Sequence, residues 1–111
     1  MRPAIVAIAA LASLTLAGAA QARGNADKGR EKAAQVCAAC HGPDGAKPVA
    51  PENPILAGQY ADYLARALLD YKTGKRANPI MKGFAEPLSR QDIEDLAAWF
   101  ASQKSSLHFQ R

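Results

Sequence analysis

The chain has 111 residues, of which 49% are hydrophobic and 22% are charged, and its formal net charge is +4. A charge this small, spread along the sequence, does not predict a nucleic-acid-binding protein, which gathers Lys and Arg on one face. The length is that of one domain. Because so short a chain buries a small share of its surface, we expect a cofactor, a metal or disulfides to add stability.

The first 22 residues have the pattern of a cleaved Sec signal peptide. Arg2 gives a positive start, residues 4–17 form a largely apolar run, and residues 20–22 (Ala-Gln-Ala) form a cleavage site. The apolar run is shorter than the roughly 20 residues of a spanning helix, which argues against an uncleaved anchor or a stable membrane span. Removing Arg2 leaves 13 basic and 10 acidic side chains, a formal +3. We expect residues 23–111 to form a single domain, monomeric and exported to the periplasm.

Three segments of the mature chain show the periodicity of amphipathic helices and none alternates as a strand does, so we expect an all-α fold. The first predicted helix covers about residues 25–40, with Asn25 as its N-cap and a stripe of small residues that includes Gly29. The second covers about residues 60–73, and Gly74 follows it where a C′ glycine belongs.

The third predicted helix covers about residues 89–103. Ser89 and Asp92 have the spacing of a capping box at its start. Trp99 and Phe100 lie further along it, and we expect them to pack against the small residues of the first helix.

Two long stretches separate the three predicted helices, residues 41–58 and residues 75–88. Both contain Pro and Gly, and both are predicted to be loops. Loops of this length in so small a domain indicate that they wrap a ligand.

Residues 37–41 read Cys-Ala-Ala-Cys-His, the C-x-x-C-H pattern of covalent haem attachment. Cys37 and Cys40 lie three residues apart, so on a helix both thiols share a face and can form thioethers with the two vinyl groups of a porphyrin. His41 then lies under the ring and offers an imidazole nitrogen to the iron. Disulfide exchange and structural zinc remain as alternatives, although the first favours a βαβ context and the second needs more ligands.

Met81 is predicted to be the second axial ligand of this iron. After Met1 leaves with the signal peptide, Met81 is the only methionine, and it lies in the second predicted loop. His and Met form a common axial pair in electron-transfer haems. Two alternatives stay open: Met81 as filler of the core, and His108 as a ligand reaching the iron from the C-terminal tail.

These residues together resemble a class I c-type cytochrome, of the small periplasmic kind and similar to one haem half of the dihaem periplasmic members. The resemblance covers the mature chain. Gly29 stands eight residues before Cys37, as the family's N-terminal-helix glycine does, and Trp99 occupies the family's aromatic position on the C-terminal helix. The resemblance implies the class I cytochrome c fold, with three main helices and loops around one covalent haem c.

One further segment resembles the family, and one position departs from it. Residues 54–58 (Pro-Ile-Leu-Ala-Gly) are similar to its Pro-x-Leu-x-Gly segment, which implies that the Pro54 carbonyl accepts a hydrogen bond from His41. Ala33 stands where many members have an aromatic residue, which predicts a thinner contact between the helices.

The function that follows is that of an electron carrier and not of an enzyme: one His/Met-ligated haem of fairly high reduction potential passes single electrons between redox proteins. Basic residues in or beside the predicted loops are expected to rim the haem edge and to dock an acidic redox partner, unless they are ordinary solvated charges: Lys47, Lys72, Lys75, Arg76 and Lys82. Two other functions stay open. One is a haem enzyme or gas sensor with a displaceable Met81, and the other is the haem subunit of a dehydrogenase.

Overall fold

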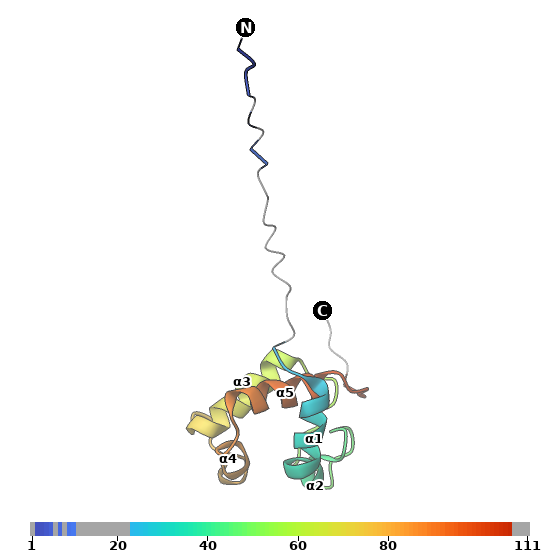
Figure 1. Cartoon of the computed structure of the whole chain (residues 1–111). Helices are drawn as coiled ribbons and strands as arrows, with labels where there is room; N and C mark the ends of the chain where they lie inside the picture. Colours follow the sequence, from blue (N-terminus) through green and yellow to red (C-terminus); the bar gives the residue numbers. More distant parts are fainter. Residues whose placement is uncertain (1, 6, 8, 11–22, 108–111) are drawn as a thin grey trace.

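The computed structural model describes residues 2–5, 7, 9–10 and 23–107 and confirms the all-α prediction, since this part of the chain contains helices and no strand. Its helices are α1 (Ala26–Val36), α2 (Ala38–His41), α3 (Ala61–Thr73), α4 (Pro79–Ala85) and α5 (Arg90–Ala101). In Figure 1, α3 and α5 lie above, with α1 and α2 descending on one side and α4 on the other. The predicted cleavage site and His108 lie outside the described residues. None of the helices in the described part combines the length and hydropathy of a bilayer span.

The first and last helices meet at a glycine. Gly29 of α1 is buried, and a Cβ there would overlap the Asp95 carbonyl of α5 and lie 2.9 Å from Trp99 Cβ. The buried Asp95 carboxylate also accepts a hydrogen bond of 2.8 Å from the backbone N–H of Asn25, just before α1. The predicted packing of Trp99 against the Gly29 face is confirmed.

The first predicted helix is divided in two. α1 ends at Val36 and α2 begins at Ala38. At this junction the N–H of Cys40 donates to the carbonyl of Cys37, three residues back, at 3.3 Å, which tightens the turn. The prediction of one continuous helix over residues 25–40 is wrong here. The periodicity of apolar residues does not reveal a single backbone hydrogen bond that spans three residues and not four.

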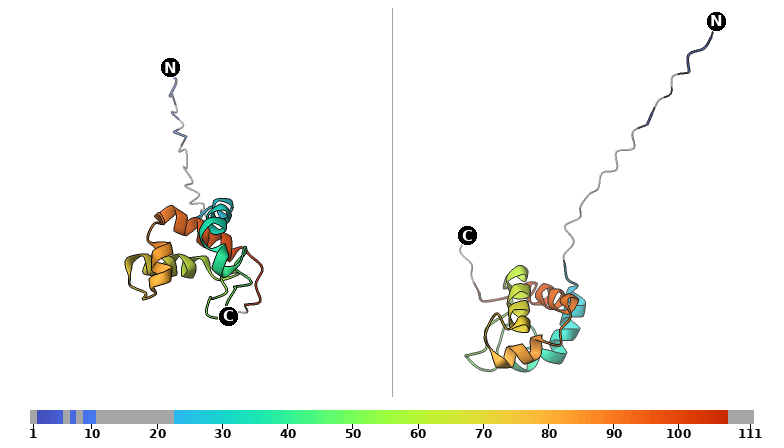
Figure 2. Two further views of the ribbon diagram at one scale, coloured as in Figure 1. Left: turned by 90° about the horizontal axis from the view of Figure 1, so that it is seen from below. Right: turned by 90° about the vertical axis from the view of Figure 1, so that its left-hand side faces the viewer.

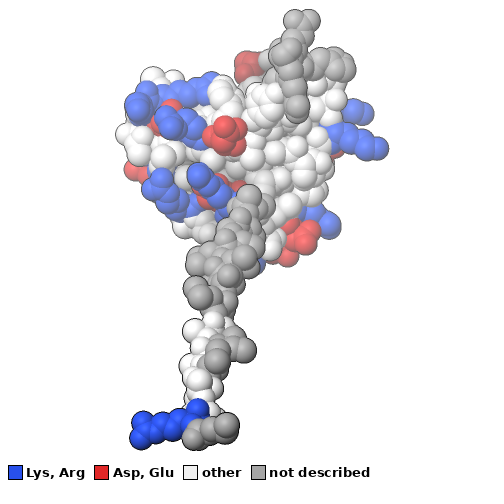
Figure 3. All heavy atoms as spheres, turned by 90° about the horizontal axis from the view of Figure 1, so that it is seen from above, with Lys and Arg blue, Asp and Glu red and all other residues white. Residues whose placement is uncertain are grey.

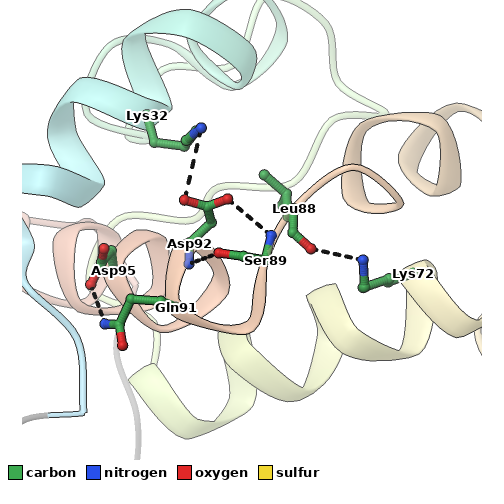
Figure 4. Close-up of polar contacts among 7 residues, drawn as sticks. All are labelled: Lys32, Lys72, Leu88, Ser89, Gln91, Asp92 and Asp95. Carbon is green, nitrogen blue, oxygen red and sulfur yellow. Dashed lines mark hydrogen bonds and ion pairs between the residues drawn. The ribbon is translucent and has the colours of Figure 1, made fainter.

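The predicted ends of the second and third helices are confirmed. Gly74 follows α3 in a left-handed conformation, with φ 80°. Ser89 precedes α5, and both bonds of the capping box form: the Asp92 N–H donates to Ser89 Oγ at 3.0 Å, and the Ser89 N–H donates to Asp92 Oδ2 at 2.9 Å (Figure 4). Two backbone N–H groups at the start of α5, which have no partner within the helix, are thus bonded by side-chain oxygens.

The stretch 75–88, predicted to be a loop, contains the short helix α4. The Asn78 side chain accepts hydrogen bonds from the N–H groups of Ile80 and Met81, each at 3.1 Å. Pro79 occupies the first helical position, where its fixed φ suits the helix and its missing N–H costs nothing. Seven residues are too few to show a helical period, so the loop prediction was wrong although Asn-Pro is a helix-start pattern.

A cluster of buried apolar side chains joins α1, α3 and α5: Ala33, Leu64, Leu88, Ile93, Leu96, Ala97 and Phe100. Ala33 has no exposed surface in this cluster. The close approach of the two backbones at Gly29 brings α5 within reach of so small a side chain, so the position that departs from the family is fully packed.

Candidate haem site

A cavity of about 570 Å³ lies between the α1–α2 side of the molecule and the α4 side. Figure 2 shows these two sides from below. The volume is in the range of sites that hold small molecules and cofactors. Leu64, Leu96 and Phe100 close the cavity on the core side, so most of its lining is apolar.

All the predicted site residues line this one cavity: Cys37, Cys40, His41, Pro54 and Met81. They come from the α1–α2 junction, the loop that follows it, and α4. The structure therefore brings together two thiols, an imidazole and a thioether on apolar walls.

His41 is held in a fixed orientation on one side of the cavity. It is 6% exposed, and its Nδ1 lies 3.0 Å from the Pro54 carbonyl oxygen, which can only accept a hydrogen bond. Nδ1 therefore carries the proton and donates it, which leaves Nε2 with a free lone pair. A metal-binding histidine is commonly oriented in this way by a carbonyl on its other nitrogen.

The loop after α2 is tied back to the same turn. The Cys40 carbonyl accepts hydrogen bonds from the Val49 N–H at 3.0 Å and from Asn53 Nδ2 at 3.3 Å. Asn53 lies next to Pro54, so this bond also fixes the carbonyl that orients His41. Asn53 was not predicted as a site residue, and its place directly before Pro54 was the only indication of it in the sequence.

The two thiols are free and half-buried. Burial raises the pKa of the Cys37 thiol to about 11. Thiol–disulfide exchange needs the thiolate and therefore a lowered pKa, so this environment does not suit that chemistry. A closed zinc site needs a group of several His, Cys, Asp or Glu side chains, and within the described ranges no such group of three or more is assembled.

Met81 lies on α4 and is half-buried at the cavity wall. Its helix is held at the start by Asn78, as described above. Two other α4 side chains line the same cavity and are exposed: Ile80 is 70% exposed and Phe84 is 44% exposed. Met81 is therefore presented by a short helix and not by the predicted loop.

The five predicted docking residues fall into two groups. Lys47, Lys75 and Lys82 are exposed and do not line the cavity. Lys72 is half-buried and donates from Nζ to two backbone carbonyls. Arg76 is exposed and lies over the Tyr71 ring, 4.7 Å from its centroid, and the side chains of Arg76 and Tyr71 line the cavity. In the view from above in Figure 3, most of the basic side chains lie on one side of the folded part with acidic ones among them, and others lie at the opposite edge.

The residues present fit haem c. Two thiols can attach it, the free Nε2 of His41 and the sulfur of Met81 can ligate its iron, and the apolar walls suit a porphyrin. Arg76 is a cation that lines the same cavity and can face the acidic propionate groups. The fold and the site together define a small α-helical protein of the c-type haem class.

Comparison with known proteins agrees with this class. The family model described as Cytochrome c matches residues 26–104. The cytochrome c4 of Pseudomonas aeruginosa is 50% identical over 100 residues, covering 90% of this chain and 49% of that protein. The protein named thiosulfate dehydrogenase electron acceptor in Stutzerimonas stutzeri is 38% identical over 95 residues, covering 82% of this chain and 44% of that protein.

A solved structure is also similar. The crystal structure of reduced recombinant cytochrome c4 from Pseudomonas stutzeri matches with a TM-score of 0.69 and 45% identity, covering 76% of this chain and 48% of that one. The chain spans about half the length of the cytochrome c4 relatives that it matches. It belongs to the cytochrome c family, has the class I cytochrome c fold, and takes one covalently bound haem c as its cofactor.

Proposed function

We propose that this chain is a carrier of single electrons between redox proteins, in which Cys37 and Cys40 attach the haem and His41 and Met81 are its axial ligands. When bound, the haem supplies a one-electron couple at its iron. One observation carries the proposal: the imidazole of His41 and the thioether of Met81 line a single apolar cavity although they come from separate elements.

The way the two ligands are held favours an electron carrier over an enzyme or a gas sensor. The carbonyl of Pro54 orients His41, and the Asn78 cap fixes the helix that carries Met81. With both ligands held by the chain, the site would keep one geometry and would leave no open position for a substrate. The name of one relative, an electron acceptor of thiosulfate dehydrogenase, supports a redox protein as partner.

The proposal extends to processing and location. Residues 1–22 are a signal peptide that is removed during export, and residues 23–111 form one haem domain in the periplasm. The arginine at position 2, the apolar run and the Ala-Gln-Ala site support this assignment. The family model matches only residues within the proposed domain, which is consistent with it.

Partner docking is assigned to the exposed predicted cations that do not line the cavity, Lys47, Lys75 and Lys82. Ile80 and Phe84 line the cavity and are exposed, so they offer an apolar contact at the cavity. A charged rim steers an acidic partner and an apolar centre permits brief close contact, a combination that suits fast exchange between proteins.

The substitution Met81→Ala tests the ligand assignment. The oxidised wild type should show the weak far-red band of a methionine bound to ferric iron, and Met81→Ala should lose the band and bind carbon monoxide readily when reduced. Lys82→Ala, which changes the exposed side chain on the other side of Met81 in the same helix and does not alter the cavity wall, is the matched control and should keep the band. A Met81→Ala spectrum identical to that of the wild type would show that another group ligates the iron.

A further inference from the structure

Lys72 lies near the end of α3 and faces the segment that joins α4 to α5. Its Nζ donates a hydrogen bond of 2.6 Å to the Glu86 carbonyl and one of 2.7 Å to the Leu88 carbonyl. Figure 4 shows the second of these contacts reaching across from α3. Both distances are short, as expected when the donor is an ammonium group.

The contact occurs at the end of α4, where carbonyl oxygens lack donors within the helix. Glu86 follows the last residue of α4, and the last carbonyls of a helix have no partner within it. Pro87 has no N–H to donate back to them. The Leu88 N–H reaches the Ala85 carbonyl, and Lys72 reaches the Glu86 carbonyl. The Lys72 ammonium supplies both a donor and a positive charge at the negative end of the helix.

Packing alone holds α4 weakly. Of the described helices, α3 is the one that α4 contacts substantially, and Lys82 and Gly83, which do not line the cavity, are exposed. The ends of so short a helix therefore decide whether it stays formed, because few buried contacts resist its opening. Asn78 holds one end and Lys72 holds the other.

The second carbonyl connects this contact to the cavity. Leu88 is 5% exposed and lines the cavity together with Met81. Its N–H donates to the Ala85 carbonyl at 3.1 Å, and the residue after it begins the α5 capping box. Lys72 thus fixes the exit of α4 and one part of the cavity wall at the same time.

We propose that Lys72 is a positioning residue, not a docking residue: by bonding the Glu86 and Leu88 carbonyls it keeps α4 closed and Met81 at the iron. This inference rests on the proposed function, which gives Met81 its role as ligand. It predicts that loss of the ammonium loosens the methionine side of the haem while the His41 side is unchanged, since His41 is held by a different element.

The test compares Lys72→Met with Lys75→Met in the haem-loaded protein. Both substitutions remove one positive charge near the end of α3, but Lys75 is an exposed side chain outside this contact. Two quantities are measured: hydrogen exchange of the α4 amides, and the affinity of imidazole for the ferric protein, read from loss of the far-red methionine band. For Lys72→Met we expect each to rise about tenfold, the effect of about 1.4 kcal/mol, while Lys75→Met stays at the wild-type values. Lys72→Arg, which keeps a donor cation, should recover most of the difference.

Faster exchange confined to α4 supports the proposal. Wild-type exchange and wild-type imidazole affinity in Lys72→Met would overturn it, and so would an equal acceleration of exchange in α1 and α5, which marks general destabilisation. Failure of the proposed function has a separate signature, because the wild type would then lack the far-red band whatever residue stands at position 72.

Discussion

The two sides of the cavity are built in different ways. On the cysteine side, α1 meets α5 backbone to backbone at the buried Gly29, and the buried Asp95 ties the start of α1 to α5. On the methionine side, a seven-residue helix with an exposed outer face is held mainly at its two ends. One side depends on close packing and the other on a few hydrogen bonds.

This difference assigns separate tasks to the two sides. Close-packed interiors resist small changes and transmit them, so the cysteine side should be the stable frame of the domain. A short helix held by caps opens at lower free energy than the frame, so the methionine side should set how firmly the second ligand is held. Substitutions on the two sides should therefore act on different measurements.

The largest effect is expected from Gly29→Ala. The added Cβ would overlap the Asp95 carbonyl, and backbone atoms cannot turn aside as a side chain can, so α1 and α5 must separate. We expect a loss of about 3 kcal/mol in the free energy of unfolding, measured by denaturant titration of the haem-loaded protein. A stability equal to that of the wild type would mean that this contact is not the frame of the domain.

A smaller effect, dependent on pH, is expected at the start of α5. The Ser89 N–H, which donates to the Asp92 carboxylate, lowers the pKa of Asp92 below its ordinary value of 3.8, with help from the Ser89 hydroxyl and from Lys32 at 3.8 Å (Figure 4). Because this pKa is lower in the folded state, the stabilisation is present above the ordinary value and is lost as the pH falls through the folded-state pKa.

The substitution Asp92→Asn measures this contribution. We expect a loss of about 1 kcal/mol in the free energy of unfolding at neutral pH, as for other helix caps. The difference from the wild type should shrink as the pH falls below 3.8 and the wild-type carboxylate takes up a proton. A difference that stays constant from neutral pH down to pH 2–3 would contradict the role given to the carboxylate charge.

An effect no larger than that of Asp92→Asn, but of the opposite sign, is expected from Gly83→Ala. Gly83 lies within α4, and a Cβ added there would meet no atom within 4 Å. Alanine favours the helix over glycine by about 1 kcal/mol, so the substitution should slow hydrogen exchange in α4 and weaken imidazole binding to the ferric protein. It contrasts directly with Gly29→Ala, since the same added methyl group disrupts one side of the cavity and stabilises the other. Faster exchange in α4 would show that the helix propensity of α4 does not set how often this helix opens.

The sequence predicted the parts of the molecule that repeat regular patterns. The periods around α3 and α5, the Ser89–Asp92 capping box and Gly74 after α3 were readable because each is a local property of neighbouring residues. The resemblance to class I cytochromes added the Pro54 carbonyl, which indeed lies 3.0 Å from His41 Nδ1.

The remaining features depend on contacts between distant segments or on very short elements. α4 escaped prediction because seven residues show no period, and the tightened turn at Cys37 changes one hydrogen bond without changing composition. The bonds from Lys72 could not be predicted, because only the fold places its ammonium beside the carbonyls at residues 86 and 88. The contacts of Lys72 depend on how the fold brings distant residues together and not on the residues next to it in the sequence.

The central claim is that a porphyrin bonded to Cys37 and Cys40 fills the cavity and completes the hydrophobic interior of a small helical domain. The most direct test is the intact mass of the purified mature protein, recorded together with its absorption spectrum, after expression in cells that mature c-type haem. The account predicts the mass of residues 23–111 plus one haem, and the spectrum of a low-spin c-type haem. A colourless protein with only the mass of its amino acids would contradict it.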